Sequence, residues 1–355
     1  MQPLLFPVLV IMRFSFSLLR QLLPLALAAW LCMWVLTIPA MREYGVSSLT
    51  VAIVLGMLLG NTAFDRFASQ LAQGMAFSKT QLLRLGIMLY GFRITLGQLA
   101  HVGWAALLVD MCIVLGTFLL ALYLGKRLGL GSNLVALVGA GSAICGAAAV
   151  LAVQPVLKAE GRDVGVGVAT VVVFGTIFMF LYPVLSHWIV PQDAVDGAWF
   201  AWGIFTGSSI HEVAQVASAG AAVNTAVADV AVITKMIRVL LLAPFLLMLP
   251  WLMRRFSGGE EMADNSKLVI PWFAIGFLGM VVLNSVISLP KQVSAVLIDF
   301  DTFLLTLAMF ALGLTTRWQS IRQAGIKPLL LAGMLAVWLL LGGGLLSYLV
   351  YCLFA

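Results

Sequence analysis

Charged side chains are scarce in this sequence. Asp, Glu, Lys and Arg make up 10% of its 355 residues, whereas hydrophobic residues make up 63% and the mean hydropathy is +1.10. A soluble domain carries about 25% charged residues, so this chain has too few polar side chains to cover a soluble surface. Its apolar runs are long enough to cross a bilayer, which takes about 20 residues. We therefore predict an all-α polytopic membrane protein with about 9–11 transmembrane segments.

Motifs of cofactor and metal chemistry are also lacking. The four cysteines are scattered without a CxxC pair, which argues against a disulfide framework or a metal site. No Walker A loop or dinucleotide-binding fingerprint occurs, and in HEVAQ the residue Gln215 stands where the zinc motif HExxH has its second ligand. A serine protease would need Ser142 or Ser208 beside His211, and nothing in the spacing indicates that geometry. We expect no cofactor, no metal and no enzymatic activity.

The basic residues, which give a net charge of +6, lie between apolar segments and form no stripe, so nucleic acid is not an expected partner. No soluble domain is expected either. Residues 1–21 are expected to be an N-terminal extension, and we interpret residues 1–11 as preceding a natural start near Met12. The apolar segments are 22–39, 47–62, 80–96, 104–125, 132–157, 164–190, 198–220, 226–253, 268–289, 300–316 and 327–353.

Lys and Arg are enriched on the cytoplasmic side of membrane proteins. If the N-terminus is cytoplasmic and every segment spans, 13 of the 20 basic residues lie inside and five outside, with two within a segment. If segments 132–157 and 198–220 are re-entrant, the count becomes 15 against three. Both interpretations stay open. Each gives a multi-pass protein of the bacterial inner membrane with a cytoplasmic N-terminus.

The sequence repeats itself. LGMLLGN, which ends at Asn61, matches LGMVVLN, which ends at Asn284, and the segments that follow also match. The matched segments are seven apart in order, so if all segments span they cross the membrane in opposite directions, as in the inverted repeats of transporters. We expect a first repeat region over 22–190 and a second over 191–355. A chance match between Leu- and Gly-rich helices is the alternative.

A Gly- and Ser-rich stretch interrupts the segment 132–157. Each Gly weakens a helix by about 1 kcal/mol relative to Ala, and a break at bilayer depth should line a cavity because lipid cannot satisfy free backbone groups. The helix that resumes would aim its positive N-terminal end at that cavity, where anions bind. Close packing of helices through small residues is the alternative. The candidate binding residues are Gly141, Ser142, Ala143, Ile144, Cys145 and Gly146.

A second interruption, in segment 198–220, weakly matches the first: GSSIHEVAQVAS aligns with GSAICGAAAVLA. Ser209-x-x-Glu212 is a capping-box pattern, which predicts a helix start at Ser209. His211 and Glu212 are expensive in an apolar segment, so they are interpreted either as a proton-coupling pair or as a structural cap or ion pair. We expect the two interruptions to meet near the membrane midplane. The candidate residues are Ser208, Ser209, His211, Glu212 and Gln215.

Two basic residues lie inside the segment 226–253. Lys235 and Arg238 are three apart and share a helix face, and each costs about 2.5–3.5 kcal/mol at the bilayer centre by insertion scales. They either pair with Glu212 or Asp229, or they attract an anionic substrate.

Weaker candidates lie near segment ends. Asn61 and Asn284 are interpreted as binding residues or as helix caps. Asp110 is close enough to the start of its segment to reach the interface. Arg93 and Arg317 are expected to snorkel, extending their charged ends to the membrane surface.

Five stretches carry a family resemblance: LGIMLYGFRITL, GAGSAICGAAAVLA, TGSSIHEVAQVASAG, KMIRVLLLAPF and IDFDTFLLTLAMFALGLTT. They resemble the YeiH-type family of proposed sulfate exporters over nearly the whole chain from about residue 20. The resemblance implies export of sulfate or a related sulfur oxyanion. More distantly, the third to sixth segments are similar to the first repeat of bile acid–sodium symporters, a branch of the cation–proton antiporter superfamily. That similarity implies a core domain that moves against a panel domain.

The leading interpretation is a secondary transporter that exports a small anion such as sulfate, with protons as a candidate coupling ion. Sodium- or proton-coupled uptake of an organic anion is one alternative. A receptor or sensor without transport is another, and the lack of an output domain argues against it. The expected partners are a small anion, a coupling ion and the lipid bilayer, with no nucleic acid and with room for a homodimer.

Overall fold

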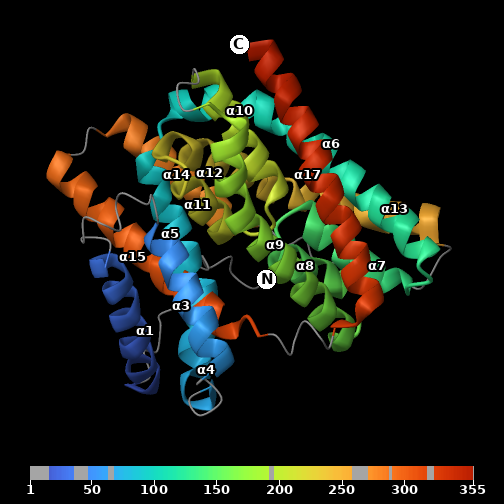
Figure 1. Cartoon of the computed structure of the whole chain (residues 1–355), viewed down its shortest axis with the longest axis horizontal. Helices are drawn as coiled ribbons and strands as arrows, with labels where there is room; N and C mark the ends of the chain where they lie inside the picture. The colour runs from blue at the N-terminus through green and yellow to red at the C-terminus, as the bar shows by residue number, and fades with distance from the viewer. Residues whose placement is uncertain are drawn as a thin grey trace, which may run out of the picture.

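The computed structural model describes residues 16–35, 47–62, 68–191, 196–257, 271–287, 290–317 and 324–354. Every regular element in these ranges is a helix, which confirms the all-α prediction (Figure 1). The expected N-terminal extension lies outside the described residues up to residue 15, and so does most of the polar loop that follows residue 257.

The helices follow the apolar segments closely. The first part of the chain forms α1 (Phe16–Val35), α3 (Ser48–Thr62), α4 (Ala68–Phe77), the π-helical turn η3 (Ser78–Leu82), α5 (Leu83–Tyr90), the 3-10 turn η4 (Gly91–Arg93), α6 (Leu96–Arg127), α7 (Ser132–Ala143), α8 (Ala147–Leu157) and α9 (Gly161–Ile189). The second part forms α10 (Asp196–Ser209), α11 (Val213–Ala221), α12 (Thr225–Leu240), α13 (Leu242–Ser257), α14 (Trp272–Val286), α15 (Lys291–Thr315) and α17 (Ile326–Phe354).

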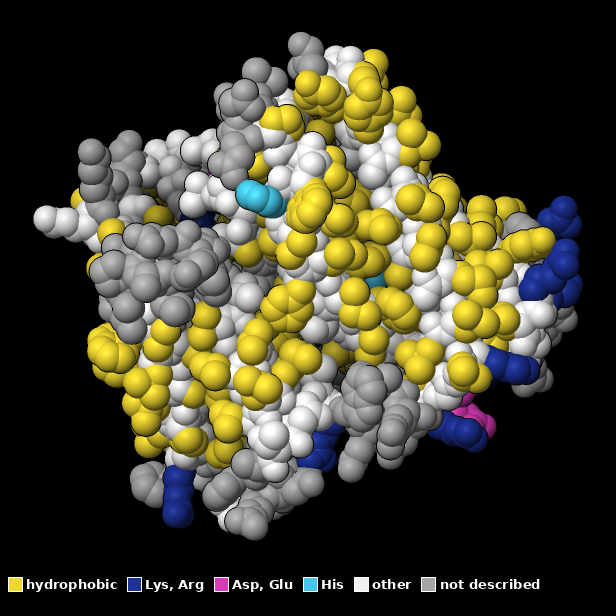
Figure 2. Space-filling model, in the orientation of Figure 1, with side chains coloured by type: hydrophobic (Ala, Val, Ile, Leu, Met, Phe, Trp, Pro, Cys, Tyr) yellow, Lys and Arg dark blue, Asp and Glu magenta, His cyan; other side chains and the backbone are white. Residues whose placement is uncertain are grey.

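The helices are built for a bilayer. Among the described residues, five helices are long and apolar enough to cross a membrane, and the pair α12 and α13, bent by 44°, makes a sixth span if it is counted as one. Large apolar side chains face outward, such as Trp188 at 82% and Trp104 at 73% exposure. Hydrophobic side chains are spread over much of the face shown in Figure 2. Water would destabilise such a surface and lipid would not. The chain is therefore a polytopic membrane protein.

Packing divides the helices into two groups. The panel group comprises α1, α3, α4, α5, α14 and α15, and the core group comprises α6 to α13 and α17. Figure 1 shows α1, α3, α4 and α15 together on one side, with α17 running across α6 and α10 on the other. Contacts within each group far exceed those between the groups, such as α11 with α3 and α12 with α14.

The first interrupted segment folds back on itself. α7 and α8 pack against each other, and Val150 of α8 fills the space beside Gly141 of α7. Gly167 of α9 lies against both Leu137 and Val150, which places these two side chains at the same level. α7 and α8 thus form an antiparallel helical hairpin.

The second interrupted segment does the same. Gly203 of α10 lies against Val230 of α12, and Gly207 lies against Thr234, so α10 runs parallel to α12. α11 joins α12 through the tight turn 222–224 and therefore runs antiparallel to it. α10 and α11 consequently form a second hairpin.

The hairpins are of the right length to re-enter a membrane. α7 has 12 residues, and a helix of this length is about 18 Å long, whereas the hydrocarbon core is about 30 Å thick. A hairpin of this length that enters from one surface would reach roughly the middle of the bilayer before it turns back. This geometry agrees with the re-entrant interpretation of segments 132–157 and 198–220.

The panel group is held by close helix approach. α3 and α15 pack so tightly that a Cβ atom on Gly313 would lie 2.9 Å from the Cα atom of Gly56, and small residues permit such contacts. Asn61 donates to the carbonyl of Thr316 at 2.9 Å, at the end of α15. Asn284 of α14 donates to the carbonyl of Ile94 at 3.0 Å, just after η4.

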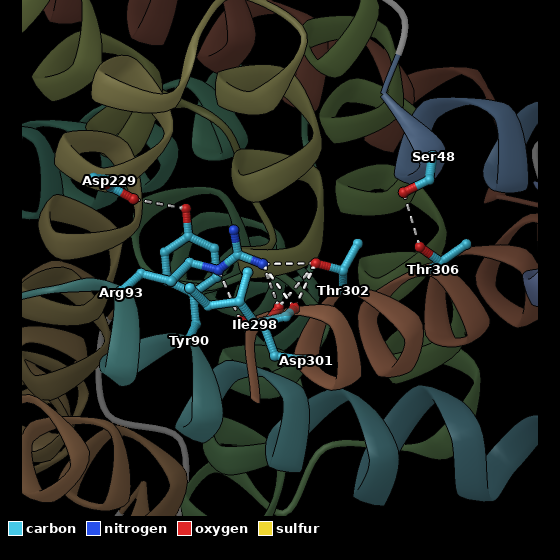
Figure 3. Close-up of polar contacts among 8 residues, drawn as sticks. All are labelled: Ser48, Tyr90, Arg93, Asp229, Ile298, Asp301, Thr302 and Thr306. Atoms are coloured by element: carbon cyan, nitrogen blue, oxygen red, sulfur yellow. Dashed lines mark hydrogen bonds and ion pairs between the residues drawn. The ribbon is translucent and has the colours of Figure 1, made fainter. Parts of the chain in front are cut away.

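A partly buried polar network reaches from the panel group to the core group (Figure 3). Arg93 forms an ion pair with Asp301, with contacts of 2.7 and 2.8 Å, and also donates to Thr302 at 2.6 Å. The prediction that Arg93 snorkels is therefore wrong, because a buried carboxylate on α15 holds it. Beside it, Tyr90 donates to Asp229 of α12 at 3.0 Å.

Candidate functional site

The tips of the two hairpins meet at one buried cation. α7 ends before Ile144 and α10 ends before Ile210, and these residues correspond in the weak match between the two segments. Lys235 is completely buried, and its Nζ atom donates to the carbonyl of Ile144 at 2.8 Å and to that of Ile210 at 2.7 Å. One ammonium group thus binds the C-terminal ends of both α7 and α10.

Arg238 reinforces the same arrangement. It is fully buried and donates to the carbonyls of Ser208 and Ile210, the latter at 2.6 Å. The last carbonyls of a helix lack partners and carry partial negative charge, so cations stabilise them. The alternative that Lys235 and Arg238 pair with Glu212 or Asp229 is wrong for the described residues, because their hydrogen bonds go to backbone carbonyls.

The tips also touch directly. Gly146 has φ +68°, and a Cβ atom there would lie 2.6 Å from Cγ of Glu212, so only glycine fits beneath this side chain. Glu212 is the N-cap of α11, and its backbone N–H donates to Oε1 of Gln215 at 3.2 Å. Gln215 in turn donates to Thr176 of α9 at 3.3 Å.

The prediction that a helix starts at Ser209 is therefore wrong. α10 ends at this residue and α11 begins at Val213. The hydroxyl of Ser209 donates backward to the carbonyl of Phe205, and Ser208 donates to the same carbonyl at 3.3 Å. The capping box exists one turn later, between Glu212 and Gln215.

Other predicted residues lie in the tips without partners among the described residues. Ser142 Oγ and both ring nitrogens of His211 are buried and form no hydrogen bond within the described part of the chain. The ring of His211 lies 6.0 Å from that of Phe178 on α9. Ala143 and Cys145 are buried, and Cys145 borders the cavity described next.

A cavity of about 450 Å³ opens between the core group and the panel group. The N-terminal ends of α8 and α11 border it through Ala147 and Val213, and Glu212 lies in its wall. Backbone N–H groups at a helix N-terminus attract anions. The charged residues of the wall are Lys79, Arg84, Glu212 and Arg317, and most of the remaining wall is apolar.

Lys79 was not among the predicted site residues. It lies in the π-helical turn η3, where it faces the cavity and donates to Thr315 of α15 at 3.2 Å. In the sequence, Lys79 lies just before an apolar segment, where a lysine ordinarily indicates only the topology of the chain. A π-helical turn has no clear sequence pattern, so the sequence did not indicate η3. Such turns are frequent at functional sites.

Two predicted candidates do not border the cavity. Asn61 and Asn284 bind carbonyls at the ends of α15 and η4 instead, which fits the helix-capping alternative. Asp110, expected near the interface, is instead completely buried in α6. No group of three or more His, Cys, Asp or Glu residues in the described ranges could hold a metal ion.

Comparison with known proteins identifies the family. The model of the family described as Conserved hypothetical protein 698 matches residues 20–332. The chain is 46% identical over 335 residues to the UPF0324 inner membrane protein YeiH of Escherichia coli K12, which covers 93% of both chains.

Two further relatives are UPF0324 membrane proteins. The one from Haemophilus influenzae is 47% identical over 86% of this chain and 90% of its own length. The one from Pseudomonas aeruginosa is 48% identical over 86% and 87%. No solved structure matches. The chain belongs to the YeiH/UPF0324 family and is a multi-pass inner membrane protein.

Proposed function

We propose that this protein is a secondary transporter of a small anion, bound where the two hairpin tips meet the cavity. One observation carries the proposal: the N-terminal ends of α8 and α11 border the same cavity, and Lys79 lies in its wall. Two helix N-termini and the basic residues Lys79, Arg84 and Arg317 favour negative charge in this cavity, and the carboxylate of Glu212, bound at the start of α11, supplies only one such charge. Sulfate or a related sulfur oxyanion is the leading substrate, and export the leading direction, from the resemblance to proposed sulfate exporters.

The C-terminal ends of α7 and α10 favour protons over sodium as the coupling ion. A coupling sodium ion would need carbonyl ligands, and the free carbonyls at the C-terminal ends of α7 and α10 are natural ones. Lys235 already occupies the carbonyls of Ile144 and Ile210 at 2.8 and 2.7 Å. A fixed ammonium group therefore takes the place of a transported cation at this point.

Inverted repeats and a cytoplasmic N-terminus complete the proposed architecture. The repeat match makes Asn61 equivalent to Asn284, and, with an offset of 222 residues for the following segments, Ile94 equivalent to Thr316. Asn61 binds the carbonyl of Thr316, and Asn284 binds that of Ile94. Each repeat thus makes the same contact with the other, as expected for two inverted copies. The distribution of basic residues supports the cytoplasmic N-terminus.

Uptake of an organic anion is the second candidate, and the cavity wall favours it. Apolar side chains such as Leu83, Val172 and Phe273 form much of the lining. Sulfate gains nothing from such a surface, whereas the hydrocarbon part of an organic anion does. The charged end would lie at the hairpin tips in both cases.

Flux in proteoliposomes tests the proposal. Vesicles would be loaded with radiolabelled sulfate or sulfite, and a pH gradient or a sodium gradient would be imposed. We expect gradient-dependent flux with protons that falls at least tenfold in Lys79→Gln and not in Lys126→Gln, because Lys126 is exposed at the end of α6. Flux of an organic acid alone would select the second candidate. Binding without flux of any anion would identify a receptor and overturn the proposal.

A further inference from the structure

Asp110 is an unusual carboxyl group. It lies in α6, its side chain is completely buried, and neither carboxyl oxygen has a hydrogen-bond partner within the described part of the chain. Two other carboxyls inside the described helices differ: Asp301 binds Arg93, and Asp229 accepts from Tyr90. Glu212 borders the cavity. A structural role therefore does not explain why the carboxyl of Asp110 is buried without a hydrogen-bond partner.

Two cations on the neighbouring helix α12 act on Asp110 by charge. α6 packs against α7, α10, α12, α14 and α17, and the charged groups that act on the carboxyl of Asp110 are Arg238 and Lys235, both on α12. These are the cations that bind the ends of the hairpin tips. The Nε atom of Arg238 also has no partner among the described residues. Asp110 is thus coupled by charge to the point where the tips meet.

Burial and the nearby cations act in opposite directions on the protonation state of Asp110. An ionised carboxylate without hydrogen-bond donors is strongly destabilised in a low-dielectric interior, so burial favours the neutral acid. Nearby cations favour the carboxylate. An anion that binds at the hairpin tips would be attracted by the same two cations and would repel the carboxylate of Asp110. The neutral acid would then be favoured.

We propose that Asp110 is a proton-binding site whose occupancy is linked to anion binding at the hairpin tips. This inference rests on the proposed function. When the anion binds, the carboxylate of Asp110 takes one proton from solvent and becomes the neutral acid, and when the anion leaves, the proton is released. Linkage of this kind is reciprocal, so protonation of Asp110 also strengthens anion binding.

Several residues with buried hydroxyl groups lie near Phe205 in the core group. Tyr182 stacks on Phe205 with ring centroids 4.5 Å apart, and Thr206 follows Phe205 in α10. Gly343 of α17 packs on Phe205, and Ser347 lies one turn along the same face. The hydroxyls of Thr206 and Ser347 are buried without a partner among the described residues, a condition that buried water normally relieves.

Infrared spectroscopy tests the site without knowledge of the substrate. The purified protein would be titrated with acid and base while the C=O stretch of protonated carboxyl groups is recorded. We expect a band from a buried carboxyl that disappears on raising the pH, is lost in Asp110→Asn and persists in Glu212→Gln. Asp110→Glu should restore a shifted band. Thermal unfolding of each variant confirms that it is folded, and a band unchanged in folded Asp110→Asn overturns the proposal.

Proton uptake tests the linkage. Sulfate or sulfite would be added to the weakly buffered protein in detergent, with bound anion measured by radiolabel and protons by an indicator dye. We expect uptake of protons with the wild type and with Glu160→Gln, whose carboxyl is exposed at the start of α9, and its loss in Asp110→Asn, which should still bind anion. Uptake that persists in Asp110→Asn, or is lost only in Glu212→Gln, refutes the linkage. Absence of anion binding in every variant refutes the proposed function, while the infrared result still decides whether Asp110 titrates.

Discussion

The hydroxyl of Tyr90 donates a 3.0 Å hydrogen bond to Oδ1 of Asp229 (Figure 3). Tyr90 ends α5 in the panel group, and Asp229 lies in α12, the core helix that carries Lys235. The guanidinium of Arg93 lies 4.9 Å from the ring centre of Tyr90 and is fixed by Asp301. If the core group moves against the panel group during transport, this hydrogen bond must either break or move with both residues in each cycle.

Removing this hydroxyl should loosen the contact between the two groups. In Tyr90→Phe the carboxyl of Asp229 loses its donor, and a bond to a charged group is worth about 1.5–3 kcal/mol. We expect the midpoint of thermal unfolding in detergent to fall. Tyr123→Phe is the matched control, because Tyr123 is 57% exposed on α6. Equal midpoints for the two variants would show that the bond does not hold the groups together.

Lys235 should be essential for the hairpin tips. In Lys235→Met the carbonyls of Ile144 and Ile210 lose their common donor, and each unsatisfied acceptor costs about 1–3 kcal/mol. We expect a loss of stability of at least about 2 kcal/mol and no flux. Lys126→Met, at an exposed position, should match the wild type. The tip assignment fails if Lys235→Met unfolds at the wild-type temperature.

The sequence predicted the apolar helices and both interruptions because these depend on local composition. Glycines and a serine within an apolar run indicate a break wherever they occur. Lys235 and Arg238 were recognised because charge inside a span is rare. Their partners were not, because Ile144 precedes Lys235 by 91 residues and its contribution is a backbone carbonyl, which every residue has.

Long-range contacts explain the failures as well. Arg93 was expected at the membrane surface, but its carboxylate partner, Asp301, is 208 residues away. The pattern Ser209-x-x-Glu212 indicated a helix start one turn too early, because α10 continues to Ser209 before it breaks. Asp110 looked close to a segment end, since the extension of α6 to Leu96 was not evident from hydropathy.

The matched asparagines allow a test of the repeat. If Asn61 and Asn284 occupy equivalent positions, Asn61→Ala and Asn284→Ala should each reduce stability by about 1 kcal/mol, the net value of a typical hydrogen bond. The double variant should lose the sum, because the two bonds involve different helix pairs. Gln70→Ala, at an exposed position of α4, is the control. A large loss from one asparagine and none from the other would count against equivalent roles.

Two glycines with positive φ help to distinguish the effect of backbone strain from the effect of contact between the hairpin tips. Gly146 has φ +68° and lies beneath Glu212, whereas Gly129 has φ +65°, and a Cβ atom added there would have no other side chain or backbone atom within 4 Å. Alanine at Gly129 suffers the strain of a positive φ, about 1–2 kcal/mol, and the ψ of −133° at Gly146 makes that conformation still less accessible to alanine. Gly146→Ala must also displace the side chain of Glu212, so the two tips cannot meet as they do here.

We therefore expect Gly129→Ala to lower the unfolding midpoint slightly and to keep anion flux, and Gly146→Ala to lose flux at least tenfold. Thermal unfolding and proteoliposome flux, measured on the same preparations, separate these effects. Replacing Glu212 by Ala in the Gly146→Ala background removes the clash and should restore part of the stability that Gly146→Ala loses. If Gly146→Ala retains full flux, contact between the tips is not required for transport, and the site must then be sought deeper in the cavity near Lys79.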